Sequence, residues 1–403
     1  MDADMARPPP LQGVTVLDLG QVYQGPYAGL LMAKAGADVI KIEPPHGEPL
    51  RAREAVGGGA SLPLAMLNSN KRAITLNLKH PRGAELLRRL ALEADVLIEN
   101  FAPGVMERLG VGAEALMAAN PRLIYATATG YGLSGPERDN LAMDITIQAA
   151  SGAIAVTGFA DGPPVKAGPA IADFLSGTHL YAGIVTALYE RERTGRGRLV
   201  EVAMIEAMFP TLASNLGMIH RAPQRAVGRT GNRHGGLSVS PYNVYPCKDG
   251  WFAIICTNEQ HWKSLAAAMG APELASDPRF CDNAARVRHM AETDALVEAW
   301  AAGLTRAEIF AVTGARRIPS APVRDLPEVL ANAHMRGRGM LEDIDHPSLG
   351  RITVPGSPLR FHGTPQTPAR LSPGLGANTA EVLQQFLDFG AAEFADLKAD
   401  GVI

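Results

Sequence analysis

The chain has 403 residues, of which 46% are hydrophobic and 20% charged, and its formal net charge is −3. This content suffices for a sizeable core, and the length indicates two or three domains. The near-neutral charge, without a block of basic residues, gives no reason to expect nucleic acid or an anionic membrane as a partner. The three cysteines, at 247, 256 and 281, lack metal-ligand spacing and favour a reducing cytoplasm. The start has no signal-peptide pattern, and no stretch of 18 uncharged apolar residues predicts a membrane span.

The N-terminal region predicts an α/β fold. Residues 13–19 are typical of a buried strand, residues 27–35 of a helix opened by Gly25-Pro26, and residues 37–43 of a second strand. A strand, helix and strand within about thirty residues form a right-handed βαβ unit, which predicts a doubly wound parallel sheet. The glycines do not follow the dinucleotide-binding pattern, so a nicotinamide cofactor has no support.

The rest of the chain predicts further strands and a second domain. Strands are expected at 72–78, 95–99 and 123–128, residues 194–204 are expected to form a turn followed by a strand, and residues 144–152 are expected to be helical. Residues 221–236 are predicted to form a linker or loop, 241–255 a hairpin, and 259–308 several helices. We expect a large domain from residues 1–220 and 330–403 and a smaller α+β domain from residues 225–325.

Asp173 stands between a Gly/Pro-rich approach and an apolar run. Leu180, Ile184 and Leu188 recur at helical spacing after it, so Asp173 is predicted at the N-cap or in the first turn of a helix. An aspartate there is more often a cap than a catalyst. The alternative is a nucleophile that the helix start helps to keep ionised.

Several other chemistries lack their motifs. The ten histidines are scattered, and neither a Gly-x-Ser-x-Gly elbow nor a Gly-Lys-Ser/Thr loop occurs. Basic residues instead recur near predicted strand ends, which indicates a polyanionic ligand such as a nucleotide or coenzyme A; they are Arg51, Lys71, Arg72, Lys79 and Arg108. The glycine-rich turn at 129–136 offers amides that could cradle an anion.

A set of motifs resembles the family III CoA-transferases. They are Leu11-Gln-Gly-Val-Thr-Val-Leu-Asp18, Gly36-Ala-Asp-Val-Ile-Lys-Ile-Glu43, Asn70-Lys-Arg72, Glu99-Asn-Phe-Ala-Pro-Gly104, Thr157-Gly-Phe-Ala-Asp-Gly-Pro-Pro164 and Thr194-Gly-Arg-Gly197. The resemblance runs from about residue 11 to the C-terminus. It implies a Rossmann-like large domain made from both chain ends, a small domain between them, and an interlocked homodimer.

The resemblance also implies roles for individual residues. Asp173 takes the place of the nucleophile. Contacts with coenzyme A, which is a substrate and not a permanently bound cofactor, fall on Arg51, Leu76, Lys79, Asn100, Phe101 and Arg108. The glycine loop of formyl-CoA transferase corresponds to 231–236, with Gly235 and Gly236 as oxyanion donors. Candidates for the acceptor pocket are Tyr23, Gln24, Tyr131, His234 and Arg229.

Departures from formyl-CoA transferase bear on the substrate. Tyr23 replaces an active-site glutamine of that enzyme, with Gln24 one position later, which argues against formate or oxalate. We therefore expect CoA transfer from a short acyl-CoA such as succinyl-CoA to a small dicarboxylic acid. The alternative is an α-methylacyl-CoA racemase, but Met143 stands where racemases carry an acid/base histidine, and a thioether transfers no proton.

Overall fold

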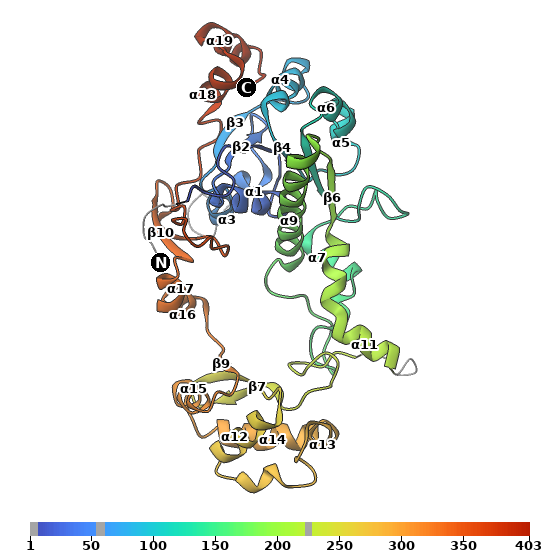
Figure 1. Ribbon diagram of the computed structural model, residues 1–403, viewed down its shortest axis with the longest axis vertical. Helices are drawn as coiled ribbons and strands as arrows, with labels where there is room; N and C mark the ends of the chain where they lie inside the picture. Colours follow the sequence, from blue (N-terminus) through green and yellow to red (C-terminus); the bar gives the residue numbers. More distant parts are fainter. Residues whose placement is uncertain (1–6, 54–60, 222–227) are drawn as a thin grey trace. The chain divides into compact units, whose positions relative to one another are not determined.

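The structure, a computed structural model, describes residues 7–53, 61–221 and 228–403 and divides the chain into two compact units (Figure 1). The first contains Met1–Ile147, Pro169–Met208 and Leu330–Ile403, and the second contains Gln148–Gly168 and Phe209–Val329. The second unit thus extends beyond the predicted small domain. Hydrogen bonds explain the addition of 148–168, because Gly231 N–H donates to Gly158 O at 2.9 Å and Arg229 donates to carbonyls of the same segment.

A six-stranded sheet forms the centre of the first unit. All its neighbouring strands are parallel, in the order β3-β2-β1-β4-β5-β6. The strands are β1 (Thr15–Asp18), β2 (Asp38–Glu43), β3 (Arg72–Thr75), β4 (Val96–Glu99), β5 (Ile124–Thr129) and β6 (Leu199–Ala203). This is the doubly wound order, in which the strand sequence reverses direction between β1 and β4. The predicted α/β fold with a parallel sheet is confirmed.

Helices cover both faces of this sheet. The helices of the first unit are α1 (Gln24–Lys34), α2 (Pro49–Ala52), α3 (Leu62–Leu67), α4 (Pro81–Glu93), α5 (Val105–Arg108), α6 (Ala113–Ala119), α9 (Ile171–Thr194), α10 (Met204–Met208), α17 (Ala333–Gly337), α18 (Thr379–Leu387) and α19 (Ala391–Ala399). Helix α7 (Asp144–Ala150) begins in this unit, which also holds a hairpin of β10 (Leu341–His346) and β11 (Gly350–Pro355). Figure 1 shows α18 close to α4 although they are far apart in the sequence.

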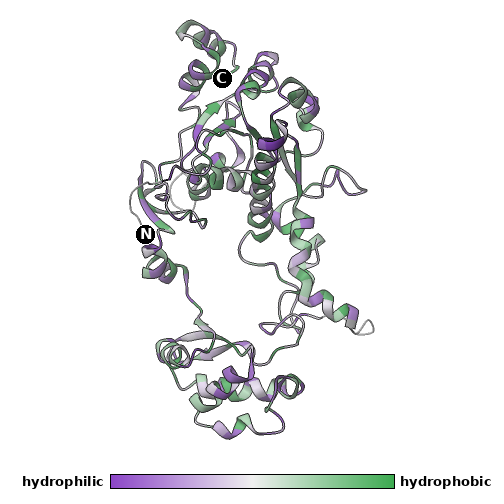
Figure 2. Cartoon of the chain, in the orientation of Figure 1, coloured by the Kyte–Doolittle hydropathy of each residue, from purple (hydrophilic) through white to green (hydrophobic). Residues whose placement is uncertain are grey.

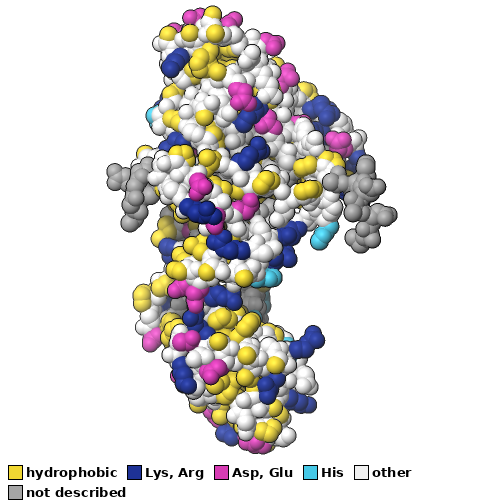
Figure 3. All heavy atoms as spheres, turned by 90° about the vertical axis from the view of Figure 1, so that its left-hand side faces the viewer, with side chains coloured by type: hydrophobic (Ala, Val, Ile, Leu, Met, Phe, Trp, Pro, Cys, Tyr) yellow, Lys and Arg dark blue, Asp and Glu magenta, His cyan; other side chains and the backbone are white. Residues whose placement is uncertain are grey.

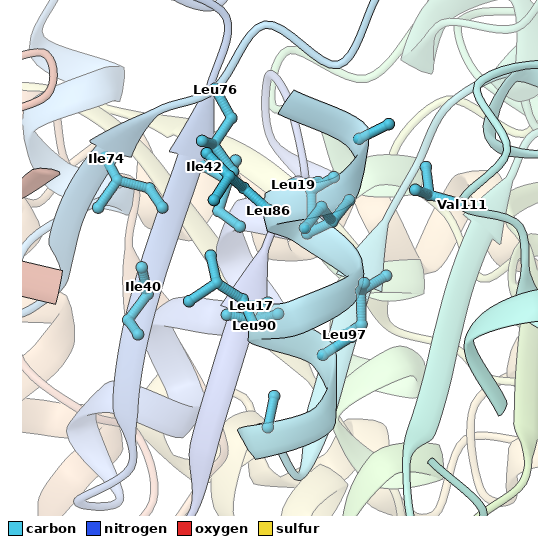
Figure 4. Packing of buried hydrophobic residues seen from close by; sticks show 14 of the residues in the cluster. Leu17, Leu19, Ile40, Ile42, Ile74, Leu76, Leu86, Leu90, Leu97 and Val111 are labelled. Atoms are coloured by element: carbon cyan, nitrogen blue, oxygen red, sulfur yellow. The ribbon is translucent and has the colours of Figure 1, made fainter. Parts of the chain in front are cut away.

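Alternate residues of each strand point to two separate hydrophobic cores, as the period of two requires. Leu17, Ile40 and Leu97 pack with α4 and α18 in one core (Figure 4), which Tyr125 and Leu383 also join. The preceding or following residues of the same strands, among them Val16, Val39 and Val96, pack against α1 and α9. Figure 2 shows hydrophobic residues concentrated along these strands and along α9.

Helix α9 is long and apolar enough, by length and composition, to cross a membrane. Core helices of water-soluble proteins meet the same criterion. In this structure Leu180, Ile184 and Ala187 of α9 are buried against the sheet, so packing explains its apolar composition.

The second unit has an antiparallel sheet of β7 (Tyr242–Cys247), β8 (Gly250–Ile255) and β9 (Ser320–Pro322). Its helices are α8 (Ala153–Val156), η1 (Phe209–Leu212), α11 (Ala213–Arg221), α12 (Glu259–Ala268), η2 (Pro272–Ala275), α13 (Asn283–Arg288), α14 (Met290–Ala301), α15 (Arg306–Ala315) and α16 (Leu326–Leu330). The predicted hairpin is present as β7 and β8, and Phe252, Trp262 and Phe280 lie in the hydrophobic core of this unit.

Charged side chains of both signs share the surface. On the face shown in Figure 3, lysines and arginines are interspersed with aspartates and glutamates.

Candidate active site at the first turn of helix α9

Asp173 lies in the first turn of α9, as one of the two sequence alternatives predicts. The helix begins at Ile171 with Ala170 as its N-cap, and no side chain of this N-cap bonds the helix. Asp173 is therefore not the cap. Within the described part of the chain no group donates a hydrogen bond to its carboxylate, which leaves both oxygens available for a ligand.

A second carboxylate, Asp144 at the start of α7, binds the amides that α9 leaves open. Its Oδ1 accepts hydrogen bonds from the backbone N–H of Ala172 at 2.9 Å and of Asp173 at 3.4 Å. A helix N-terminus favours negative charge, so Asp144 takes the stabilising position that the sequence assigned to Asp173.

The ionisation of Asp173 differs from the sequence-based expectation. Burial, which disfavours the charged form, and the nearby charge of Asp144 raise the pKa of Asp173 to about 7, against an opposing effect of Arg53. The prediction is that the helix start helps to keep Asp173 ionised; burial and the charge of Asp144, which occupies that end of the helix, act in the opposite direction.

Aromatic rings from α1 and the residue before it pack next to Asp173. The ring of Tyr23 stacks on Phe174 with centroids 6.0 Å apart, and Tyr27 meets the same ring edge-on at 4.8 Å. Helices α1 and α9 approach closely here, since a Cβ added to Gly177 would lie only 2.6 Å from the carbonyl oxygen of Gln24. Tyr23 and Gln24 thus lie against the first turns of α9, as expected for residues of one site.

A cavity of about 820 Å³ opens at the carboxyl ends of β1 to β4, where open α/β sheets bind ligands. Four of the residues predicted to contact coenzyme A line it together, and they are Leu76, Lys79, Phe101 and Arg108. Leu19, Gln21, His46 and Asn77 also line it and were not predicted. The volume is within the range of cofactor-sized pockets.

Two other residues predicted to contact coenzyme A do not line this cavity. The guanidinium of Arg51 donates to both carboxylate oxygens of Glu43, at 2.6 and 2.7 Å, and to the carbonyl of Pro373. Asn100 binds the backbone of Gln21 through both side-chain atoms, at 2.7 and 3.0 Å. The structure therefore gives both side chains partners within the protein, and their contact with the ligand stays a prediction.

In the glycine-rich turn that follows β5, two backbone amides already have hydrogen-bond partners within the protein. The N–H of Gly132 donates to Thr129 Oγ1 at 2.8 Å, and the N–H of Leu133 donates to Glu201. These two amides are therefore not free to cradle an anion. Tyr131 lies half-buried in the same turn.

The remaining predicted residues belong to the second unit. His234 contacts Ser214 at 3.3 Å, and its Nδ1 accepts the N–H of Gly236 at 3.2 Å. Gly235 lies against Asn215. Arg229 donates to the backbone carbonyls of Phe159, Ala160 and Gly162, so its guanidinium is already engaged. Roles for Arg229, His234, Gly235 and Gly236 in the site stay predictions.

A metal centre has no structural support in the described ranges, which contain no group of three or more His, Cys, Asp or Glu side chains able to hold an ion. Sequence reasoning missed Asp144. No pattern links it to Asp173, because the two carboxylates meet only through the packing of α7 against the start of α9.

The doubly wound sheet, the cavity at its switch point and the unpaired carboxylate define an α/β protein with a crevice for a nucleotide-sized ligand. Residues 11–379 match CoA-transferase family III. A formyl-CoA:oxalate CoA-transferase of Streptomyces avermitilis is 37% identical over 98% of this chain and 99% of its own. A succinyl-CoA–D-citramalate CoA-transferase of Chloroflexus aurantiacus is 36% identical with the same coverage.

A crystal structure of a CaiB/BaiF family protein from Brucella suis superposes with a TM-score of 0.80 at 33% identity, covering 94% of this chain and 99% of that one. The chain belongs to CoA-transferase family III and is a CoA-transferase.

Proposed function

We propose that this CoA-transferase works through covalent catalysis by Asp173 and moves coenzyme A from a short acyl-CoA to a small dicarboxylic acid. The observation that carries the proposal is the carboxylate of Asp173, which is half-buried in the first turn of α9 and receives no hydrogen bond from the described residues. A carboxylate that is partly shielded from water and accepts no hydrogen bond keeps its nucleophilicity.

The reaction balances without an external proton. A carboxylate oxygen of Asp173 attacks the thioester carbonyl, the C–S bond breaks, and a mixed anhydride and CoA thiolate result. The thiolate then attacks the aspartyl carbonyl, the anhydride C–O bond breaks, and the donor acid leaves an aspartyl-CoA thioester behind. The acceptor carboxylate reverses both steps. Each step passes an oxyanion, for which we propose the Gly235 and Gly236 amides as donors.

The cavity suits the rest of the acyl-CoA. Lys79 and Arg108 line it, and cations of this kind bind phosphates. Leu76 and Phe101 add apolar surface for the less polar parts of the ligand. The proposal is that the thioester end reaches Asp173 past Gln21 and Tyr23.

The names of the relatives support a dicarboxylic acceptor. Oxalate and citramalate, which appear in the names of the two relatives given above, both carry two carboxylates. Identities of 37% and 36% do not separate the formyl-CoA from the succinyl-CoA enzymes. A screen of succinyl-, acetyl- and formyl-CoA against these acids would identify the pair, and we expect succinyl-CoA to be the best donor.

Trapping tests the nucleophile. With acyl-CoA and hydroxylamine we expect modification of Asp173, found by peptide mass spectrometry, and loss of turnover by about 10⁴-fold in Asp173→Ala. An Asp173→Ala variant with undiminished turnover would refute the proposal. Deuterium entering the substrate's α-carbon with Asp173 unmodified would favour the racemase instead, against which Met143 stands.

The proposed homodimer has support on the surface of the first unit. Leu141, Met143 and Ile145 are 85%, 49% and 53% exposed within five positions of one another, on either side of Asp144, which binds the start of α9. Apolar side chains clustered in this way mark a surface that another chain covers. We expect Leu141→Glu to shift the sedimentation of the protein towards the monomer, whereas Leu92→Glu, on exposed α4 surface, does not. Equal sedimentation of both variants with the wild type would count against this interface.

A further inference from the structure

The loop between β1 and α1 is held almost entirely by side chains. Residues 20–22 make few backbone hydrogen bonds of their own, yet the structure gives partners to their polar groups. Asp18 Oδ1 accepts a hydrogen bond from the N–H of Gly20 at 2.9 Å, and Lys41 Nζ donates to the carbonyl oxygen of Gly20. Asn100 binds both backbone groups of Gln21, and Glu48 Oε2 accepts the N–H of Val22 at 2.9 Å.

The charged members of this set form a buried network. Asp18 pairs with Lys71 at 2.7 Å, and all of their side-chain surface is buried. Lys41 pairs with Glu48 at 2.9 Å, with 1% of each side chain exposed. A neighbouring pair, Glu43 with Arg51 at 2.6 Å, adjoins the network. With this pair, the network contains three carboxylates and three cations. Its charges therefore balance, which buried ions require.

The loop itself adopts an unfavourable conformation. Val22 has φ +64°, in the left-handed region. A β-branched residue there is a genuine outlier, and such residues persist only where the surroundings impose the conformation. The hydrogen bond from Val22 N–H to the buried Glu48 is one means by which this structure imposes it.

The loop contacts both halves of the candidate site. On one side, Leu19 and Gln21 line the cavity that suits coenzyme A. On the other, Tyr23 stacks on Phe174, the residue next to Asp173. The conformation of residues 20–22 therefore sets the cavity wall and the first turn of α9 relative to each other.

We propose that Glu48 and Lys41 are positioning residues, which hold residues 20–22 in place, with Val22 in the left-handed region, so that the bound thioester and Asp173 stay aligned. The proposal rests on the proposed function, because it assigns the alignment to the reaction at Asp173. A misplacement of reacting groups by about 1 Å costs on the order of a hundredfold in rate.

Val22→Gly is the first test, because it relieves the backbone strain without touching any charge. Glycine occupies φ +64° freely but also many other conformations. We expect an unchanged or higher melting temperature together with about a tenfold lower kcat. A purely structural role of the loop would leave kcat unchanged in such a stable variant, and full kcat in Val22→Gly would overturn the proposal.

Glu48→Ala and Glu48→Gln form the second test. The alanine variant loses the acceptor for Val22 N–H, and we expect kcat to fall about a hundredfold. Glutamine keeps an oxygen acceptor at the same place, and we expect it to restore at least about tenfold of that loss.

Asp95→Ala is the matched control. Asp95 accepts a backbone N–H, that of Thr15 at 2.8 Å, and pairs with Arg191 at 2.9 Å, but it lies at the opposite end of the sheet. We expect it to lose stability while its folded fraction keeps the wild-type kcat. An equal loss of kcat in Asp95→Ala and Glu48→Ala, at matched folded fractions, would contradict the proposal.

The affinity for coenzyme A, measured by calorimetry, separates this proposal from that of the nucleophile. Glu48→Ala is expected to weaken CoA binding about tenfold, because Gln21 moves, whereas Asp95→Ala is not. If Asp173→Ala keeps turnover, the nucleophile proposal fails, while these binding and kcat differences still decide the positioning role.

Discussion

Two carboxylates with different environments meet at the start of α9. Asp144 binds the open amides of the helix, and the carboxylate of Asp173 beside it accepts no hydrogen bond from the described residues. Different environments assign different roles to chemically identical groups. Asp144 stabilises the helix start, and Asp173 remains available for chemistry.

The activity is expected to rise with pH. The pKa of Asp173 is about 7, and only its carboxylate form attacks a thioester. The value of kcat/KM should therefore increase as the pH rises through about 7 and level off above it. A pH–rate profile measures this, and a profile that is flat from pH 5 to 9 would contradict it.

The variant Asp144→Asn shows whether the ionisation of Asp173 causes this pH dependence of kcat/KM. Burial also raises the pKa of Glu99 to about 7, so the profile alone is ambiguous. Asparagine keeps an oxygen for the α9 amides but removes the charge that raises the pKa of Asp173. The acidic limb should move to lower pH, whereas control by Glu99 would leave it in place.

Asp173 should also cost stability at neutral pH. Its pKa is raised on folding from 3.8 to about 7, so stability present below the lower value is lost as the pH rises through the higher one. We expect Asp173→Asn to raise the free energy of unfolding by about 2 kcal/mol at pH 8, a gain that shrinks towards pH 4. Urea unfolding at both pH values measures it; an equal gain at both would be inconsistent with ionisation as the cause.

At the scale of elements, the close packing of α1 on α9 places the site. Gly177 permits it, because any Cβ there would meet the carbonyl oxygen of Gln24 at 2.6 Å. The sequence predicted both helices from their apolar spacing. It could not predict which faces of the two helices meet, since that depends on how both pack on the same face of the sheet.

Gly177→Ala tests this packing. Backbone must shift to admit the methyl group, and we expect a loss of about 1–3 kcal/mol in stability together with lower activity. Gly217→Ala, in α11, is the control: nothing lies within 4 Å of the added atom, so stability should be unchanged or higher. Chemical denaturation compares the two, and equal effects would argue against a tight contact at Gly177.

At the scale of the whole molecule, both ends of the chain build the cavity. The N–H of Asn77 donates to Val402 O at 2.7 Å, and Gly401 lines the cavity beside Lys79. The strand and helix pattern predicted the parallel sheet, and strand ends pointed to Lys79 and Arg108, whereas Leu76 and Phe101 came from the family resemblance. Sequence reasoning missed Asp144, Glu48 and Gly401, whose positions depend on contacts between distant segments.

Lys79 and Arg108 are expected to contribute to the binding of acyl-CoA and little to the chemical step. Alanine at either position is expected to raise the KM for acyl-CoA about tenfold with little change in kcat, since the phosphates stay bound throughout the reaction. A pantetheine thioester, which lacks the nucleotide, should show almost no difference between variant and wild type. An equal KM increase for both substrates would show that Lys79 and Arg108 do not bind the nucleotide phosphates.

The transfer of an acceptor oxygen to Asp173 tests the central claim most directly. When the acceptor acid carries oxygen-18 in both carboxylate positions, its attack on the aspartyl-CoA thioester and the return of the thiolate leave one labelled oxygen on the aspartate. After a single turnover, mass spectrometry of the peptide that contains Asp173 should show one oxygen-18 atom in that side chain. An unlabelled Asp173 in enzyme that has turned over would contradict the anhydride route.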